Sequence, residues 1–272
     1  MSKLLLTLIS LLLISACNNG TQKPPERNKP EAPLLKTKQF IVENSPDSAL
    51  INDAALMDDA VLMDKNVLTG KINFGKSQHF DIVPKNYSTK EVYIRKETLN
   101  AFLGMAEAAQ KSGVNLKIIS GARSFEHQKA IWNRKWNRSS ETDLRKRALN
   151  ILTYSAMPMT SRHHWGTDID LNSLSNGYFE KGEGLKIYQW LTENAHKYGF
   201  CQVYSDKTTN SRTGYKMEKW HWSYMPLAKS FLRQYIRVMS DADLAGFEGS
   251  TLAKDLAILK DYVKAVADLN QP

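Results

Sequence analysis

The stretch SRHHWGTDID, residues 161–170, decides how this chain folds. Its second half alternates polar and apolar residues through 167–171, which predicts a half-buried β-strand. Successive side chains of a strand point to opposite faces, so Asp168 and Asp170 share one face. The two histidines of the stretch lie just before this strand. The sequence therefore predicts imidazoles and carboxylates gathered beside one strand.

A second stretch, EKWHW at residues 218–222, also places a carboxylate and a histidine next to a predicted strand. Two neutral imidazoles and one carboxylate form a common catalytic zinc set, which leaves a fourth position for water. A further carboxylate nearby can act as a general base. Together, the two stretches predict a metal-dependent catalytic centre.

The hydrophobic pattern around these stretches predicts an α+β fold, in which helices surround a small, mainly antiparallel sheet with the zinc site at the sheet. Apolar residues recur at helical spacing after residue 97, and Gly113 is suited to end that helix. Further helices are predicted over residues 126–136, 140–152 with Ser140 as N-cap, 184–198, 227–239 and 250–269. Further strands are predicted over residues 116–119, 200–204 and 220–224. The last helix could form a coiled-coil seam, but a helix packed on the domain is the favoured interpretation.

The N-terminus has the pattern of an export signal. A lysine precedes an apolar run from Leu4 to Ile14, which is shorter than a membrane span of about 20 residues. Ile14-Ser15-Ala16-Cys17 resembles the bacterial lipobox, in which the cysteine becomes the lipidated N-terminus after cleavage. Residues 1–16 are thus predicted to be a lipoprotein signal peptide, and residues 17–38 a flexible, proline-rich tether. We expect an exported lipoprotein, anchored through Cys17 to a membrane of a bacterial cell envelope.

Composition narrows the choice of partners. The 272 residues include 37 Lys and Arg against 28 Asp and Glu, and this charge of +9 favours nucleic acid, a membrane surface or a cell-wall polymer. The basic, aromatic stretch 129–147 could stack bases. In an exported protein, however, a helix pair with buried tryptophans and a solvated basic face is the better interpretation, with no nucleic-acid partner. Two cysteines exclude a disulfide scaffold and a four-cysteine zinc site, and Cys201 is expected to be a small buried hydrophobe.

Three motifs follow one another along the chain. A Gly-x-Arg-Ser turn after a predicted strand, followed by a glutamine, lies at Gly121, Arg123, Ser124 and Gln128. The pattern Ser-x-His-x-x-Gly-x-x-x-Asp lies at Ser161, His163, Gly166 and Asp170. The pattern Glu-x-x-His lies at Glu218 and His221. In these motifs the chain resembles the D-alanyl-D-alanine carboxypeptidases of the VanY type, the M15 zinc metallopeptidases. The resemblance implies a zinc peptidase domain over residues 39–240, followed by a C-terminal helical extension over residues 241–272.

This resemblance also implies roles for individual residues. The zinc ligands would be His163, Asp170 and His221. Glu218 would take a proton from zinc-activated water and later pass it to the leaving amine. Arg123 would face the developing oxyanion or the substrate. Because Glu218 and His221 would face opposite sides of a regular strand, Glu218 is expected in a turn before the strand or across a bulge.

By the same resemblance, three polar side chains would contact the substrate: Ser161, Ser124 and Gln128. Other details of the site stay open at this stage. His164 could replace His163 as the ligand, although the motif spacing favours His163. Asp168 is either a support behind a ligand or a solvated residue. Arg162 stands where the family often has glutamate, and it is expected at the rim of the site.

The predicted function is an exported zinc D,D-carboxypeptidase that hydrolyses the terminal D-alanine of peptidoglycan stem peptides. Such a substrate ends in a carboxylate, which a positively charged chain suits. An L,D-carboxypeptidase or a peptidoglycan endopeptidase could use the same zinc site, because the cleft walls determine which peptide fits. A non-catalytic cell-wall-binding lipoprotein is the alternative from another class.

Overall fold

Four short strands form an antiparallel sheet in the order β3-β4-β6-β5. They are β3 (Ile118–Ser120), β4 (Asp168–Leu171), β5 (Phe200–Cys201) and β6 (His221–Tyr224). A separate antiparallel pair joins β1 (Phe80–Ile82) to β2 (Tyr93–Arg95). This computed structural model describes residues 62–267, so the predicted signal peptide, Cys17 and the tether lie outside the described residues.

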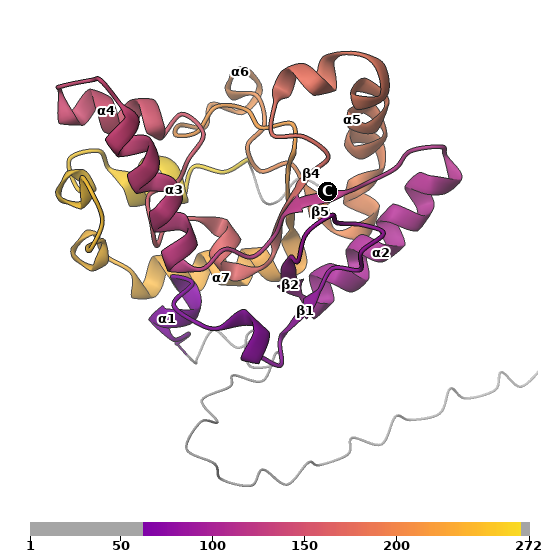
Figure 1. The fold of residues 1–272 in the computed structure, drawn as a ribbon, viewed down its shortest axis with the longest axis horizontal. Coiled ribbons are helices and arrows are strands. Elements are labelled where there is room, and N and C mark those ends of the chain that lie inside the picture. Colours follow the sequence, from indigo (N-terminus) through magenta and orange to yellow (C-terminus); the bar gives the residue numbers. More distant parts are fainter. Residues whose placement is uncertain (1–61, 268–272) are drawn as a thin grey trace, which may run out of the picture. The chain divides into compact units, whose positions relative to one another are not determined.

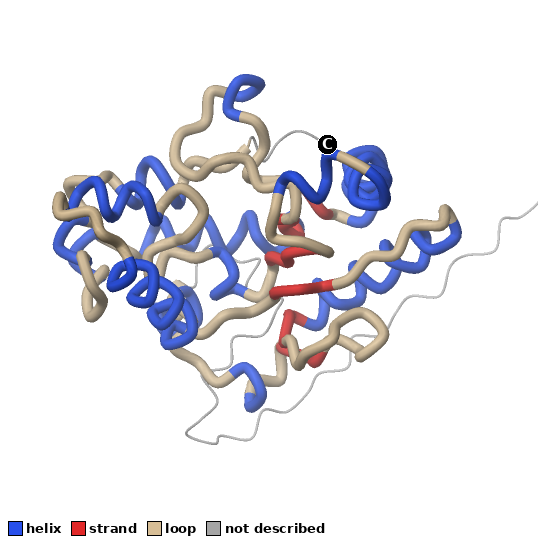
Figure 2. The backbone as a smooth tube through the Cα atoms, turned by 45° about the horizontal axis from the view of Figure 1, so that its top comes forward, coloured by secondary structure: helices blue, strands red, loops and turns tan. Residues whose placement is uncertain are grey.

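Helices cover the sheet (Figures 1 and 2). The α-helices are α1 (Lys65–Leu68), α2 (Lys96–Lys111), α3 (Phe125–Arg138), α4 (Leu144–Ile151), α5 (Gly182–Asn194), α6 (Lys207–Asn210) and α7 (Met225–Val238). Shorter 3-10 segments are η2 (Phe74–Lys76), η3 (Arg162–Trp165), η4 (Asn176–Glu180), η5 (Ala195–Tyr198), η6 (Asp241–Asp243) and η7 (Ser250–Leu252), and η8 (Leu259–Val263) is a π-helix. Within residues 62–267, none of the helices has the length and apolar character needed to cross a membrane. The α+β prediction is confirmed.

Two hydrophobic clusters fill the described part of the chain. One joins α3, α4, α7 and the C-terminal segments around residues such as Trp132, Trp165 and Phe231. The other joins α2 and α5 to the sheet around Phe102 and Ile169. In Figure 1, α3, α4 and α7 lie to one side of the sheet, and α2 and α5 lie to the other. The sheet is therefore enclosed between helices.

This enclosure corrects the prediction of a half-buried strand at 167–171. All four residues of β4 are buried, including both aspartates. Ile169 packs into the cluster with α2 and α5, while its neighbours Asp168 and Asp170 point the other way. Polar residues alternate here because that face holds a buried polar site.

The other expected elements differ mainly at their ends. The helix predicted from residue 140 begins at Leu144, so the expected N-cap at Ser140 is wrong. Asp143 caps it instead, because its carboxylate accepts hydrogen bonds from the backbone N–H of Arg145 (2.9 Å) and Lys146 (3.1 Å). The strand predicted over 200–204 ends at Cys201, and that cysteine is half-buried rather than fully buried.

The continuous helix predicted over residues 250–269 is also wrong. The described part of this segment contains only the short η7 and η8, with turns between them. Ala257 between them has a positive φ of 49°, which interrupts a right-handed helix. Ala253, Leu256, Ile258 and Val263 are nevertheless buried in the first cluster, so the segment packs on the domain as expected.

Candidate metal centre

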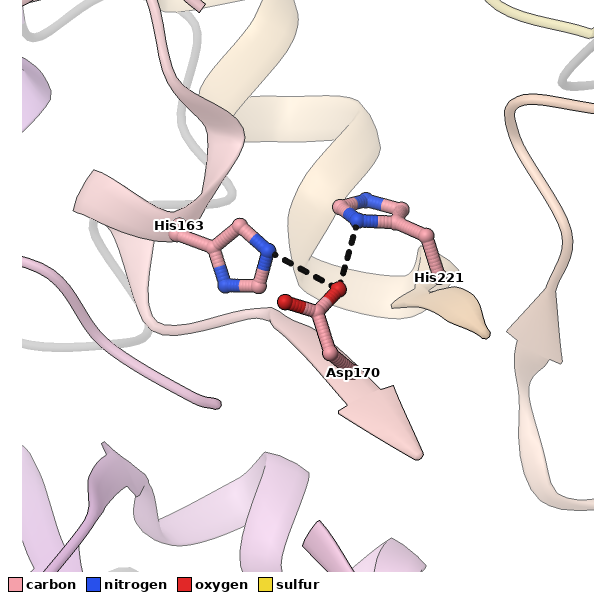
Figure 3. A group of neighbouring side chains, drawn as sticks. All are labelled: His163, Asp170 and His221. Atoms are coloured by element: carbon pink, nitrogen blue, oxygen red, sulfur yellow. Dashed lines mark hydrogen bonds and ion pairs between the residues drawn. The ribbon is translucent and has the colours of Figure 1, made fainter. Parts of the chain in front are cut away.

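Three side chains from three elements meet at the sheet (Figure 3). His163 comes from η3, Asp170 from β4 and His221 from β6. Asp170 and His221 lie directly opposite one another across the two strands. The Oδ1 atom of Asp170 is 3.3 Å from His163 Nε2 and 3.1 Å from His221 Nδ1. The three residues can each offer one ligand atom, with all three atoms within 4.8 Å of one another.

The histidine rings are held in the orientation that a metal site needs. His163 Nδ1 lies 2.8 Å from the carbonyl oxygen of Gly121. A carbonyl oxygen only accepts, so Nδ1 carries the hydrogen and the lone pair of Nε2 faces the group. That Nε2 is buried and makes no hydrogen bond within residues 62–267. Buried polar atoms are almost always hydrogen-bonded, so a lone pair directed at a carboxylate fits a metal ligand.

Asp168 lies behind His221. His221 Nε2 is 3.4 Å from Asp168 Oδ1, on the opposite side of the ring from Asp170. Such a carboxylate fixes the orientation of a ligating imidazole and strengthens its donor atom. The structure therefore resolves the open role of Asp168: the residue is fully buried and is a support behind the ring.

Arg162 holds Asp168 in place. Its Nε donates to Asp168 Oδ1 at 3.1 Å, and its terminal nitrogen donates to Ser223 Oγ at 2.6 Å. The side chain is 1% exposed, so the expectation of a rim position is wrong. The physical reason is Asp168 itself, because a buried carboxylate needs a buried cation.

The charges of the group support one another. His163 and His221 keep the pKa of Asp170 well below its ordinary value, although burial alone would raise it. Burial lowers the pKa of His163 and Arg123 lowers it further, while Asp170 acts in the opposite direction. Burial also acts to lower the pKa of His221, but Asp168 and Asp170 outweigh it and raise that pKa to about 9. A metal cation would replace the proton of His221 in this anionic surrounding.

Glu218 lies in a turn just before β6, as the sequence argument required. The backbone N–H of His221 donates to the carbonyl oxygen of Glu218 at 3.3 Å, which closes the turn. Its carboxylate Oε2 reaches to 3.7 Å from His221 Nδ1. Burial raises the pKa of Glu218 to about 8. This carboxyl group can therefore hold or release a proton near neutral pH.

Arg123 approaches the group from the turn before α3. One terminal nitrogen lies 3.5 Å from Asp170 Oδ2. The other donates to Gln128 Oε1 at 2.8 Å, and Gln128 Nε2 donates to the carbonyl oxygen of Ala156 at 2.7 Å. Gln128 is fully buried, so its observed contacts orient Arg123.

The two predicted serine contacts lie in different places. Ser161 is buried in a small cavity that Glu218, His163 and His221 also line. Ser124 caps α3, where its hydroxyl oxygen accepts from the backbone N–H of His127 at 3.2 Å. It borders a different cavity, formed with residues 70–75.

His164 points away from the group. Its Nδ1 lies 2.7 Å from the carbonyl oxygen of Arg123, and the ring is fully buried. Burial lowers its pKa to about 3, so the ring is neutral. Of the two adjacent histidines, only His163 belongs to the group that can hold a metal.

A cleft of about 680 Å³ opens onto Asp170, Glu218 and Arg123. Its lining also includes residues that the motifs did not indicate: Lys90, His127, Arg134, Lys135, Tyr154 and Trp220. The only sequence signal for the α3 residues was the basic, aromatic stretch 129–147. Its tryptophans Trp132 and Trp136 are buried in the core, as the helix-pair interpretation expected.

Known proteins are similar to this chain over the region that contains these motifs. A family model for VanY, D-alanyl-D-alanine carboxypeptidase, matches residues 91–227. A Bacillus subtilis protein named "Putative carboxypeptidase YodJ" is 34% identical over 155 residues, which cover 56% of this chain and 51% of that one. A D-alanyl-D-alanine carboxypeptidase of Enterococcus faecalis is 32% identical over 122 residues, 44% of this chain and 43% of that one. The chain thus spans about half the length, or less, of these curated relatives.

Among solved structures, a D,D-pentapeptidase VanY in complex with Zn(II) has 25% sequence identity and a TM-score of 0.42, and the match covers 57% of this chain and 89% of that one.

Proposed function

Because the chain belongs to the VanY family of D-alanyl-D-alanine carboxypeptidases, we propose that it is an exported zinc peptidase that removes the terminal D-alanine from peptidoglycan stem peptides. The observation that carries the proposal is the buried group of His163, Asp170 and His221, with the Glu218 carboxylate beside it. A purely structural cluster would be expected to satisfy its own polar atoms. Here His163 Nε2 has no hydrogen bond to any described residue while it faces a carboxylate.

Zinc is the metal that the donor set fits. Two imidazoles and one carboxylate make up the three protein ligands of many catalytic zinc sites. The facing atoms are His163 Nε2, His221 Nδ1 and Asp170 Oδ1. When bound, zinc supplies Lewis-acid polarisation of the scissile carbonyl and lowers the pKa of the attacking water. Asp168 and the Gly121 carbonyl oxygen keep the two rings in position for it.

Glu218 is the proton carrier in this proposal. Its carboxylate would accept the proton of the attacking water and then give it to the nitrogen of the leaving D-alanine. Burial holds its pKa near 8, so the carboxyl group can change protonation state during the reaction without a large free-energy cost. Its position in the turn before β6 puts it on the cleft side of the ligands.

Arg123 is the permanent cation at the reacting centre. A guanidinium ion offers donors suited to a carboxylate or to the oxyanion that develops on the scissile carbonyl. Gln128 orients it from behind, so Arg123 is held ready before substrate arrives. Ser161 lines the same site and is proposed as a substrate contact.

The site of action follows from the N-terminal sequence. We propose that the chain is exported and then acylated at Cys17, which would place the peptidase at a membrane of the cell envelope. Its substrate, a peptidoglycan stem peptide, is found on that side of the membrane. A Cys17→Ser chain, expressed in a bacterium and fractionated, should lose its membrane association while keeping its peptidase activity.

The test of the activity is a defined substrate. The zinc-loaded protein is incubated with a synthetic stem pentapeptide that ends in D-Ala–D-Ala, and the products are weighed by mass spectrometry. We expect loss of one alanine. Release of alanine only from a tetrapeptide would instead identify an L,D-carboxypeptidase. Cleavage of an internal bond would identify an endopeptidase, and binding without hydrolysis would identify a cell-wall-binding protein.

The Glu218→Gln variant completes this test. It removes the proton carrier but none of the proposed ligands, so turnover should fall by about 10²–10⁴-fold while zinc is retained. Glu193→Gln, on the exposed surface of α5, is the matched control and should keep full activity. Equal activity of the two variants would remove Glu218 from the mechanism.

A further inference from the structure

The cleft beside the metal group holds more positive charge than one substrate carboxylate requires. Two carboxylates line it, Asp170 and Glu218, and both belong to the centre already described. Four basic side chains of the described residues line it: Lys90, Arg123, Arg134 and Lys135. A peptide that ends in D-alanine brings a single terminal carboxylate, which one cation can hold.

Arg123 is the cation already in use at the reacting centre. It lies beside Asp170 and is fixed by Gln128. The other three lie outside this arrangement. Within residues 62–267, neither the ammonium group of Lys90 nor the guanidinium group of Arg134 makes a hydrogen bond or an ion pair. The ammonium group of Lys135 donates to the hydroxyl of the buried Ser155, which carries no charge.

Arg134 and Lys135 form a stripe along α3 together with His127 and Ile131. His127, Ile131, Arg134 and Lys135 all line the cleft, and their spacing of four, three and one places them along one side of the helix. The nine residues from His127 to Lys135 span about 12 Å of helix. An extended peptide covers about 3.3–3.6 Å per residue, so the stripe matches about four residues of substrate.

The like charges also act on one another. Burial lowers the pKa of Lys135, and although Glu218 opposes this, Arg134 and Arg123 lower it further. The pKa of His127 is lowered first by burial and then by Arg123, Lys90 and Arg134. An anion bound among these groups would relieve both the repulsion and the lost hydration.

We propose that this stripe is a binding site for a second carboxylate of the peptide substrate, with Arg134 and Lys135 as the residues that select it. The cleft would thus prefer stem peptides in which an acidic group near the scissile bond is free over peptides in which that group is a carboxamide. This inference rests on the proposed peptidase function and specifies its substrate class.

The experiment compares two pentapeptides that both end in D-Ala–D-Ala and differ only in one group, a free carboxylate or its carboxamide, within four residues of the scissile bond. Their kcat/KM values are measured with the zinc-loaded enzyme, and their Kd values with zinc-loaded Glu218→Gln. We expect the free carboxylate to be favoured about tenfold or more, mainly through KM, because charge-assisted hydrogen bonds contribute about 1.5–3 kcal/mol.

Variants assign the preference to the stripe. In Arg134→Gln/Lys135→Met the preference should fall close to one. Arg138→Gln removes one positive charge from the same helix outside the cleft lining and should keep the preference. Equal kcat/KM and Kd for the two peptides, or a preference that survives in the double variant, would overturn the inference. Hydrolysis of neither peptide by wild type would instead refute the proposed function, and the Kd values would then decide the binding preference separately.

Discussion

At the scale of single residues, Asp168 and Asp170 share one face of β4 but have different partners. Asp170 faces both histidines of the metal group, whereas Asp168 lies behind His221 and pairs with Arg162. The resemblance to the family motif implied Asp170, rather than Asp168, as the ligand. The sequence could not predict the contacts of Asp168. They depend on the β4–β6 register, in which Asp168 lies opposite Ser223, and on Arg162, whose side chain donates to both residues.

Asp168→Asn should therefore weaken zinc binding. The amide keeps the size of the side chain but loses the charge that orients His221, and loss of such support typically costs about 10–100-fold in metal affinity. The variant also leaves Arg162 without its buried partner, so a lower Tm is expected. The zinc affinity is therefore measured at a temperature well below the Tm of the variant. Titration against a zinc chelator gives the Kd. The exposed Asp255→Asn is the control, and a Kd equal to that of wild type in Asp168→Asn would contradict the role.

Zinc binding should also release a proton from His221. This imidazole has a pKa of about 9 before metal binds, so it is mostly protonated at pH 7.5, and the proton competes with zinc for the ring. The zinc Kd should fall by about tenfold for each pH unit between pH 7 and pH 9, and then level off. Calorimetric titration in buffers with different heats of ionisation counts the protons released. Binding without proton release would show that His221 is not a ligand.

At the scale of elements, the long helices and the strands beside the motifs were predicted from periodicity, because their buried faces are contiguous in sequence. The hairpin of β1 and β2 was not predicted, since residues 40–95 carry no clear pattern. Its role is visible only in three dimensions. Gly121, in the turn after β3, packs directly against this hairpin, and a Cβ there would lie 2.5 Å from Ile94 Cγ2 and 2.7 Å from the carbonyl oxygen of Tyr93.

Gly121→Ala tests this coupling between the hairpin and the metal centre. The added methyl group must push the turn away from β2, at a cost of about 1–3 kcal/mol in the free energy of unfolding. The carbonyl oxygen of Gly121 orients His163, so zinc affinity should fall as well. Gly104→Ala in α2 is the matched exchange, because its Cβ would meet nothing closer than 3.8 Å. It should stabilise the protein by about 0.4–1 kcal/mol. Denaturant titration compares the two, and equal effects would refute the argument from packing.

At the scale of the whole molecule, the fold encloses a polar group between two hydrophobic clusters, and a metal cation is what makes this enclosure favourable. Burial leaves Glu218 with a pKa of about 8, and the neighbouring carboxylates outweigh burial to leave His221 with a pKa of about 9, against ordinary values of 4.5 and 6.5. Each group therefore binds its proton more tightly in the folded chain than in the unfolded chain. The free energy of unfolding of the metal-free protein thus depends on pH through its active site.

The sign of this dependence gives a prediction for the whole chain. Between pH 7 and pH 9 the folded metal-free protein holds protons on Glu218 and His221 that the unfolded chain has released, so its stability should fall as the pH rises. His163 and His164 have lowered pKa values and act below pH 6.5, outside this window. Denaturant titrations at pH 7 and pH 9, with chelator and with zinc, measure the effect.

Zinc should raise stability at both pH values, because binding to the folded state alone adds about 2.7 kcal/mol at a free concentration 100 times the Kd. The gain should be larger at pH 9, where fewer protons compete with zinc for His221. In Glu218→Gln the loss between pH 7 and pH 8 should shrink, since that variant has no carboxyl proton to release, while the His221 contribution up to pH 9 remains. A metal-free wild-type protein whose stability is flat or rises over this window would show that the two protons are not held in the fold. The buried charges would then be balanced within the protein alone, and the enclosure of the site would not depend on a metal.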